Sequence, residues 1–368
     1  MKIDARASAW VRLHASGVPS RALVKLLRAF GSPEALLDAR PAHRRAYTTP
    51  AAEKALTAGP PAERLQATLD WLAEGAHGLL AWDDAQYPAS LLETGDPPPV
   101  LYTIGDVALL GRPGMAIVGS RNATPQGRAD AEAFAKALSH AGMTIVSGLA
   151  LGIDAAAHRG GLAGPGSTIA VIGTGPDRVY PARNRDLAHA IAESGLIISE
   201  FAPGTPPLPS NFPRRNRLIS GLSRGLLVVE ATLSSGSLIT ARLAGEQGRE
   251  VFALPGSIHS PFARGCHKLI REGAKLVETA QDILEELRLP GIDVSVPTHP
   301  SPLSVTGPRP DDPDAVAVLA ALGHETLAVD AIVVRSTLEA NNVVATLTLL
   351  ELDGRVAAVA GGCWQRRS

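Results

Sequence analysis

The chain has 368 residues, which is too long for one ordinary core and predicts about two to three domains. Hydrophobic residues make up 45% and charged residues 19%, which excludes a disordered chain. The net charge of the chain is −1. The segments 1–75 and 112–288 have a net charge of +4 each, whereas the segments 76–111 and 289–368 have net charges of −5 and −4. No apolar run forms a signal peptide or approaches the ~18 residues of a membrane span, so we expect a soluble, cytoplasmic protein.

Residues 1–75 predict a small helical domain. Helices are expected over Ser8–Ala15 and Ser20–Phe30, and a third begins at Pro33 after the capping Ser32. The apolar positions of the second helix have the spacing of a small core: Leu23, Leu26, Leu27 and Phe30. The run SGVPSRALVKLLRAFGS also resembles a SAM-like or helix-hairpin-helix nucleic-acid module, although it lacks the usual Gly-x-Gly hairpin. The sequence leaves open whether these helices form only a small structural core or also bind nucleic acid.

Residues 76–288 alternate apolar strands with helices, such as Gln126–His140 and Ser237–Gln247. The expected strands are Met115–Val118, Thr144–Val146, Thr168–Ile172, Leu196–Ile198, Leu226–Val229 and Val251–Ala253. Such alternation predicts an α/β domain with a mostly parallel sheet covered on both faces, a Rossmann-like doubly wound fold. Ligands of such sheets bind beyond the carboxyl ends of the strands.

The last quarter of the chain divides into a linker and a small domain. Residues 289–313 hold seven prolines and predict a semi-rigid Pro-rich linker. Residues 314–368 predict three helices and a hairpin that turns near Gly361-Gly362, the pattern of a winged helix. The expected elements are helices at Ala315–Leu322, Leu327–Val334 and Asn342–Leu350 and a hairpin at Arg355–Trp364.

Small residues follow four of the predicted strands, each before a helix. They are Gly119-Ser120-Arg121, Ser147-Gly148, Gly173-Thr174-Gly175 and Ser234-Ser235-Gly236-Ser237. Free backbone N–H groups at helix starts favour anions, and glycine lets the backbone approach a phosphate. One such loop is explained by a tight turn alone. Four at one edge of one sheet favour an anion-binding rim.

Arginines gather near these loops, which suits a polyphosphate track better than a single nucleotide. They are Arg121, Arg178, Arg183, Arg185, Arg214, Arg215, Arg217 and Arg224. Two alternatives stay open: some of them, Arg217 above all, can be structural partners of Glu200 or Glu230, and the arginine-rich composition can reflect genomic base usage.

Several classes of site are disfavoured by spacing. Gly173-Thr174-Gly175 continues to Arg178 where a dinucleotide fingerprint needs glycine, and no P-loop motif occurs. Cys266 and Cys363 stand alone, so no disulfide framework, zinc site, metal or cofactor is predicted. Asp154 and His158 share a helix face but lack a third ligand or a nucleophile, so catalysis by them is not predicted. Glu200 and Glu230 are expected to pair with arginine.

Six ordered motifs resemble the DNA-processing protein A family, DprA or Smf, over residues 80–287. They are VGSR (118–121), SGLALGIDAAAHRGGL (147–162), GTGPDRVYPARNRDL (173–187), NFPRRNRLISGLS (211–223), VVEATLSSGSLITARLAGEQGREVFALPG (228–256) and GCHKLIREGAKLV (265–277). The segment YPASLLETGDPPPVLYTIGD (87–106) is similar to the entry into that family's extended Rossmann fold, and residues 314–368 resemble its winged helix.

The resemblance implies a non-enzymatic protein of natural transformation that binds single-stranded DNA without sequence preference. It implies a homodimer that loads a RecA-type recombinase, with a single-strand binding protein as a further partner. Arg121 would contact phosphate, and the loop around Tyr180-Pro181 would line the same pocket. Asn211, Arg214 and Arg215 of the fourth motif would also bind DNA. The family often has lysine where this chain has Ala182, so Arg178 or Arg183 would replace it.

The motif Gly265–Val277 resembles the family's dimer surface, whose apolar centre would be Leu269, Ile270, Leu276 and Val277, with His267 where asparagine is common. The candidate recognition helix Asn341–Leu352 lacks Lys and Arg, which favours protein contact over DNA contact. DNA contact stays open as the alternative, because Arg355, Arg366 and Arg367 follow that helix. Three aromatic residues are expected in the core rather than under bases: Tyr180, Phe201 and Phe212. The rival function is a Rossmann-like enzyme that cleaves nucleoside monophosphates, although its P-G-G-x-G-T-x-x-E motif is absent.

Overall fold

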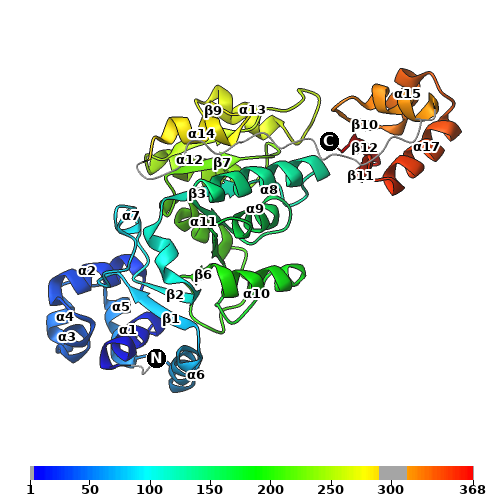
Figure 1. Ribbon diagram of the computed structural model, residues 1–368. Helices are drawn as coiled ribbons and strands as arrows, with labels where there is room; N and C mark the ends of the chain where they lie inside the picture. The colour runs from blue at the N-terminus through cyan, green and yellow to red at the C-terminus, as the bar shows by residue number, and fades with distance from the viewer. Residues whose placement is uncertain (1–3, 290–312, 368) are drawn as a thin grey trace.

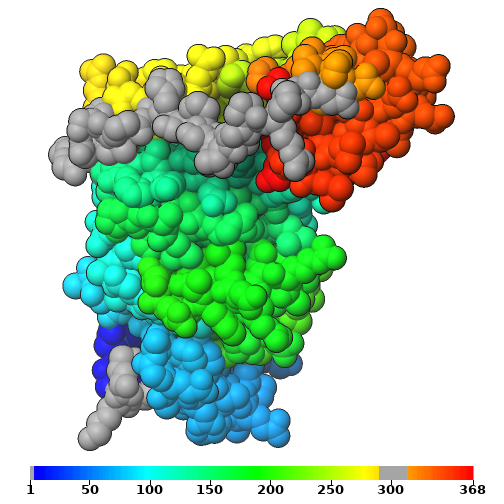
Figure 2. All heavy atoms as spheres, turned by 45° about the vertical axis from the view of Figure 1, so that its right-hand side comes forward, coloured from blue at the N-terminus to red at the C-terminus, as the bar shows by residue number. Residues whose placement is uncertain are grey.

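The structure is a computed structural model that describes residues 4–289 and 313–367. It contains an N-terminal helical unit, a central α/β unit and a C-terminal winged helix (Figure 1). The helical unit and the winged helix lie at opposite ends of the central unit in Figures 1 and 2. The predicted domain boundaries stay predictions, and residues 290–312 of the predicted linker lie outside the described residues.

Residues 4–73 form six helices, of which the sequence predicted the first three. Ser32 caps α3 as expected, since its Oγ accepts the N–H of Ala35. The helices are α1 (Ala5–Ala15), α2 (Ser20–Phe30), α3 (Pro33–Asp38), α4 (Pro41–Arg44), α5 (Pro50–Ala58) and α6 (Ala62–Ala73). Their buried core includes Trp10 and Leu26 and continues onto Val100 and Tyr102 of the sheet. The helical unit therefore shares a core with the first strands.

Residues 77–276 contribute nine strands to one sheet, in the order β1-β2-β6-β5-β4-β3-β7-β8-β9. The strands are β1 (His77–Ala81), β2 (Val100–Gly105), β3 (Gly114–Val118), β4 (Thr144–Ser147), β5 (Thr168–Val171), β6 (Leu196–Ser199), β7 (Gly225–Val228), β8 (Glu250–Ala253) and β9 (Lys275–Leu276). The strands from β3 to β9 run parallel, whereas β1 and β2 add an antiparallel edge. The predicted mostly parallel α/β fold is confirmed.

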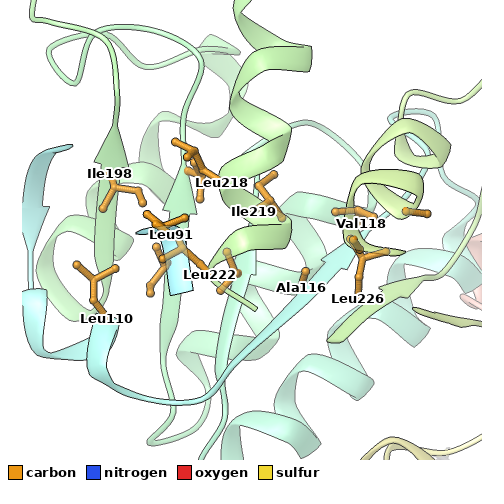
Figure 3. Close-up of a cluster of buried hydrophobic side chains, with 14 of the residues drawn as sticks. Leu91, Leu110, Ala116, Val118, Ile198, Leu218, Ile219, Leu222 and Leu226 are labelled. Carbon is orange, nitrogen blue, oxygen red and sulfur yellow. The ribbon is translucent and has the colours of Figure 1, made fainter. Parts of the chain in front are cut away.

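Helices cover both faces of this sheet. They are α7 (Ala89–Leu92), η1 (Val107–Gly111), α8 (Pro125–His140), α9 (Ile153–Leu162), η2 (Ala182–Asn184), α10 (Arg185–Ser194), α11 (Asn211–Gly221), α12 (Ser237–Glu246), α13 (Arg264–Arg271) and α14 (Ala280–Leu287). Alternate strand residues point to opposite faces, so Ala116 and Val118 pack with α11 and α12 while Met115 and Ile117 pack with α8 and α9. Figure 3 shows Leu218 of α11 in the first of these clusters.

The described C-terminal residues, 313–367, form the predicted winged helix. Its elements are α15 (Pro313–Leu322), β10 (Thr326–Ala328), α16 (Val329–Ser336), α17 (Ala340–Leu352), β11 (Val356–Val359) and β12 (Cys363–Arg366). The helix predicted from Leu327 begins instead at Val329, because Leu327 and Ala328 belong to β10 and pair with β12. The core contains Val318, Leu347 and Val356.

Candidate nucleic-acid interface

The sheet changes winding direction between β3 and β7, and a cleft of about 620 Å³ opens beyond the carboxyl ends of these strands. From β3 the chain winds outward through β4, β5 and β6, and it then crosses back to β7 on the other side of β3. The loops after β3 and β7 separate at this switch point, where doubly wound sheets bind their ligands. The loops 119–122 and 232–237 and helix α11 line the cleft.

The loop after β3 is held in place by its backbone. The N–H of Ser120 donates to the carbonyl of Glu230 at 2.7 Å, and the Ser120 carbonyl accepts from Ile153 at 3.2 Å. A Cβ at Gly119 would lie 2.6 Å from a side-chain carbon of Ile153, so this position needs glycine. The exposed guanidinium of Arg121 lies 5.8 Å from the ring centre of Phe212. Arg121 therefore presents its charge to the cleft from a fixed backbone.

Arg215 supplies a second cation, buried beneath the cleft. Its Nη1 donates to the carbonyls of Gly148, at 2.5 Å, and Val171. Burial lowers the pKa of Arg215 to about 10, and Asp154 favours its charged form, so the guanidinium stays protonated at neutral pH. The Asp154 carboxylate accepts the N–H groups of Gly148, at 3.1 Å, and Ala150. The cleft consequently has a fixed positive charge in its floor.

Aromatic side chains form one wall of the cleft. Tyr180 is 49% exposed, and its ring lies 5.5 Å from that of Phe212. The amide of Asn184 ties the neighbouring loop down by donating to Leu149, at 2.9 Å, and to Ala150. The expectation that all three aromatic residues are core is wrong for Tyr180, while Phe201 is buried as expected.

The predicted binding residues divide into three groups. Those that line the cleft are Gly119, Ser120, Arg121, Arg215, Ser235, Gly236 and Ser237. Five are buried and do not line it: Ser147, Gly148, Gly173, Gly175 and Asn211. Four are exposed arginines outside the lining: Arg178, Arg183, Arg185 and Arg214. All four predicted loops follow neighbouring strands, but only the first and fourth reach the cleft surface.

Several lining residues were not among the predicted ones. They are Val118, Asn122, Ala150, Asp154, Pro207, Pro209, Phe212, Pro213, Asn216, Ile219, Thr232, Ile239, Thr240 and Phe262. Tyr180 also lines the cleft, as the family resemblance implied for its loop. The motif that contains Asn211 also contains Phe212, Pro213, Asn216 and Ile219. Phe212, Asn216 and Ile219 have the spacing of one helix face, which could have indicated that they line the same surface.

The buried titratable groups around the cleft have structural partners. His158 is fully buried, and its Nε2 accepts the N–H of Leu149 at 3.2 Å, so Nδ1 carries the proton and donates to Thr168. Burial lowers the pKa of His158 to about 3. Glu200 binds Arg217 at 2.6 Å, as predicted.

Glu230 forms no ion pair with an arginine of the described residues, so the predicted pair is not found there. Its carboxylate accepts the N–H of Thr124 at 2.9 Å and the Thr124 hydroxyl at 2.5 Å, which fixes the start of α8. Burial raises the pKa of Glu230 above its usual range. The Glu230 side chain therefore holds the start of α8 in place instead of pairing with an arginine.

The four predicted dimer residues differ in exposure. Val277 is fully buried and Leu269 is 8% exposed, and both pack in the core of the chain itself. Ile270 is half-buried, and Leu276 is 46% exposed on β9, the last strand of the sheet. Only Ile270 and Leu276 therefore present substantial surface to another chain.

The sequence profile described as DNA recombination-mediator protein A matches residues 78–288, more than half of the chain. This chain belongs to the DNA recombination-mediator protein A family. The profile of the DprA winged helix domain matches residues 301–362. In the described parts of this family member no helix is long and apolar enough to span a membrane, and no cluster of three metal-ligating side chains occurs.

Relatives within the DNA recombination-mediator protein A family are similar over most of the chain. Protein Smf of Escherichia coli is 43% identical over 308 residues, which cover 82% of this chain and 81% of that protein. DNA processing protein DprA of Streptococcus pneumoniae is 50% identical over 203 residues, 55% of this chain and 72% of that protein.

Two solved structures of DprA proteins share the fold. The X-ray structure of DprA from Streptococcus pneumoniae has a TM-score of 0.68 and 39% identity and covers 78% of this chain and 99% of that one. DprA from Helicobacter pylori, whose structure addresses its single-stranded DNA binding mode, has a TM-score of 0.53 and 33% identity, over 58% of this chain and 95% of that one.

Proposed function

We propose that this protein binds single-stranded DNA without sequence preference in the cleft between the β3 and β7 loops. The observation that carries the proposal is that two cations line the same cleft beside the exposed ring of Tyr180: Arg121 is exposed and Arg215 is buried. Cations neutralise phosphates and an aromatic face accepts any base, so such a site tolerates all sequences. The single-stranded DNA binding of the Helicobacter pylori relative supports it.

We further propose that the bound strand is passed to a RecA-type recombinase during natural transformation, with no catalytic step. The family's description as a recombination mediator supports this role. The rival nucleotide-cleaving enzyme would need an available carboxylate in the cleft, whereas Asp154 already accepts two backbone N–H groups. Assembly of recombinase on DNA coated with single-strand binding protein, with and without this protein, tests the loading step.

The Arg121→Ala variant is expected to weaken binding of oligothymidylate and of mixed-sequence strands alike, by about tenfold to a hundredfold, because a charged hydrogen bond contributes roughly 1.5–3 kcal/mol. About five phosphate contacts would give the wild type a salt slope near −3.5, at about −0.7 per contact, and the variant a shallower one. Fluorescence anisotropy over a salt series measures both. A flat salt response would favour a mononucleotide site, and loss for only some sequences would contradict backbone contact.

The Arg183→Ala variant is expected to weaken strand binding several-fold more than Arg178→Ala. Both arginines flank the exposed Tyr180, but the Nε of Arg178 lies 3.6 Å from the carboxylate of Asp177, whereas Arg183 has no ion pair within the described residues. Arg183 is therefore the better replacement for the lysine that the family has at Ala182. Equal losses in the two variants, measured by the same anisotropy assay, would overturn this assignment.

We propose that β9 and its neighbour Ile270 form the homodimer surface. An exposed apolar residue on an edge strand favours pairing with a second copy. The Leu276→Arg variant is expected to be monomeric by light scattering, because a charge would be buried in the contact. Leu92→Arg is the control, since Leu92 is equally exposed, at 44%, on α7. A dimeric Leu276→Arg variant would place the interface elsewhere.

We propose that α17 of the winged helix contacts protein rather than DNA. Its exposed face carries Val344, Leu349 and Leu352, which are 49%, 61% and 80% exposed, and the helix contains no Lys or Arg. Duplex binding needs phosphate-neutralising charge on the recognition helix. Exposed apolar side chains suit a protein surface instead.

A further inference from the structure

Helix α2 of the N-terminal helical unit carries three cations on one face. Arg21, Lys25 and Arg28 stand at i, i+4 and i+7, so their side chains share one side of the helix, over about 10 Å of its length. All three are exposed, and α2 contains no acidic residue. The opposite face, with Leu23 and Leu27, packs into the core. We name Arg21, Lys25 and Arg28 the α2 stripe.

The charges of the α2 stripe are nearly unpaired within the described residues. Arg21 is 82% exposed, and its nearest carboxylate, that of Asp96, is 4.0 Å away. Lys25 and Arg28 form no ion pair within residues 4–289 and 313–367. Two unpaired cations and a third with only a distant carboxylate partner form a row of positive charge that attracts a polyanion.

The stripe starts beside the helix that lines the cleft. The guanidinium of Arg214, on α11, donates to the hydroxyl of Ser20, the first residue of α2, at 3.2 Å. Asp96 joins the same two helices, because its carboxylate also lies 3.6 Å from Arg217 of α11. The neighbours Arg215 and Asn216 of α11 line the cleft. Arg214 is exposed and also lies 3.0 Å from the carboxylate of Glu200, so it fixes the start of the α2 stripe beside the helix that lines the cleft.

We propose that the α2 stripe is a second contact for the backbone of single-stranded DNA, continuous with the cleft through Arg214. This inference rests on the proposed function and extends it, since the strand would be held by two units of the chain. The helical unit then serves to lengthen the bound segment. Its contact uses the side of a helix rather than a hairpin of the helix-hairpin-helix type.

The experiment compares two oligothymidylates, of about 6 and about 20 nucleotides; the first lies near the lower end and the second beyond the upper end of the roughly 4–16 nucleotides of single-strand sites. The full-length variant Arg21→Ala, Lys25→Ala, Arg28→Ala is expected to bind the short oligomer within twofold of the wild type. It is expected to bind the long one about tenfold or more weakly at low salt, with a salt slope shallower by about 2, since three contacts each contribute about 0.7.

The matched control removes three exposed charges elsewhere on the same helical unit, in the variant Arg40→Ala, Arg45→Ala, Lys54→Ala. It is expected to bind both oligomers like the wild type. Equal long-oligomer binding by the stripe variant and the control would overturn the α2 contact while leaving the cleft intact. A wild type that binds neither oligomer, or an Arg121→Ala variant without effect on the short one, would instead overturn the proposed function.

Discussion

Acidification from pH 7 to 4.5 is expected to destabilise this protein through His158, by about 3 kcal/mol, because each pH unit below 6.5 contributes ~1.36 kcal/mol. The imidazole is fully buried, and its pKa is about 3 in the folded state against an ordinary 6.5. Below pH 6.5 the unfolded chain binds a proton that the folded chain rejects, so the free energy of unfolding falls. Above pH 6.5 both states are neutral, and the contribution vanishes.

The readout is the difference in pH dependence between the wild type and His158→Gln, measured by urea unfolding at pH 7, 6, 5 and 4.5. Three buried carboxyl groups act oppositely: burial raises the pKa values of Asp154, Glu200 and Glu230, which favours the folded state as they take up protons. His14 acts in the same direction as His158, because burial lowers its pKa to about 4. The contribution of His158 to the pH dependence is therefore obtained only from the difference between the wild type and the His158→Gln variant. His189→Gln, at an exposed site, is the control. An unchanged slope in His158→Gln would contradict a neutral buried imidazole.

Glu200→Ala is expected to cost about 3–5 kcal/mol of unfolding free energy, because it leaves buried cationic charge unpaired. The Glu200 carboxylate is almost fully buried and lies 2.6 Å from Arg217 and 3.0 Å from Arg214. Among the described residues, Asp96, at 3.6 Å, is then the one carboxylate left to Arg217, whose side chain is 12% exposed. Urea unfolding at pH 7 measures the loss.

Two further variants distinguish the stability contribution of the buried Glu200–Arg217 pair from that of an exposed ion pair. Glu200→Leu combined with Arg217→Leu is expected to recover most of the stability, since apolar replacements of buried ion pairs are often neutral. Glu132→Ala removes an exposed pair with Arg159, whose atoms are 3.3 Å apart, and is expected to cost about 1 kcal/mol or less. A Glu200→Ala loss no larger than that of Glu132→Ala would show that the buried pair contributes little.

Local signals in the sequence predicted most of the elements and the mostly parallel arrangement of the central sheet, but not the order of its strands. Alternation of short apolar runs with amphipathic segments placed β3 to β8 within one or two residues, because those strands are buried on both faces. The strands β1 and β2 were missed. They are antiparallel, and their burial comes partly from Trp10 and Leu26 of the helical unit, which are distant in sequence.

The sequence by itself determined that glycine, serine and arginine gather at the carboxyl edge of a parallel sheet, because strand direction follows from the βαβ pattern. Only the tertiary structure decided which of them face the cleft. The sequence does not distinguish Arg121 from Arg215, yet Arg121 is exposed, whereas Arg215 is buried beneath the cleft and donates to two backbone carbonyls. Likewise Leu276 is exposed and Val277 is buried. Neighbouring residues take opposite environments because the packing of distant helices fixes which side of the chain is enclosed.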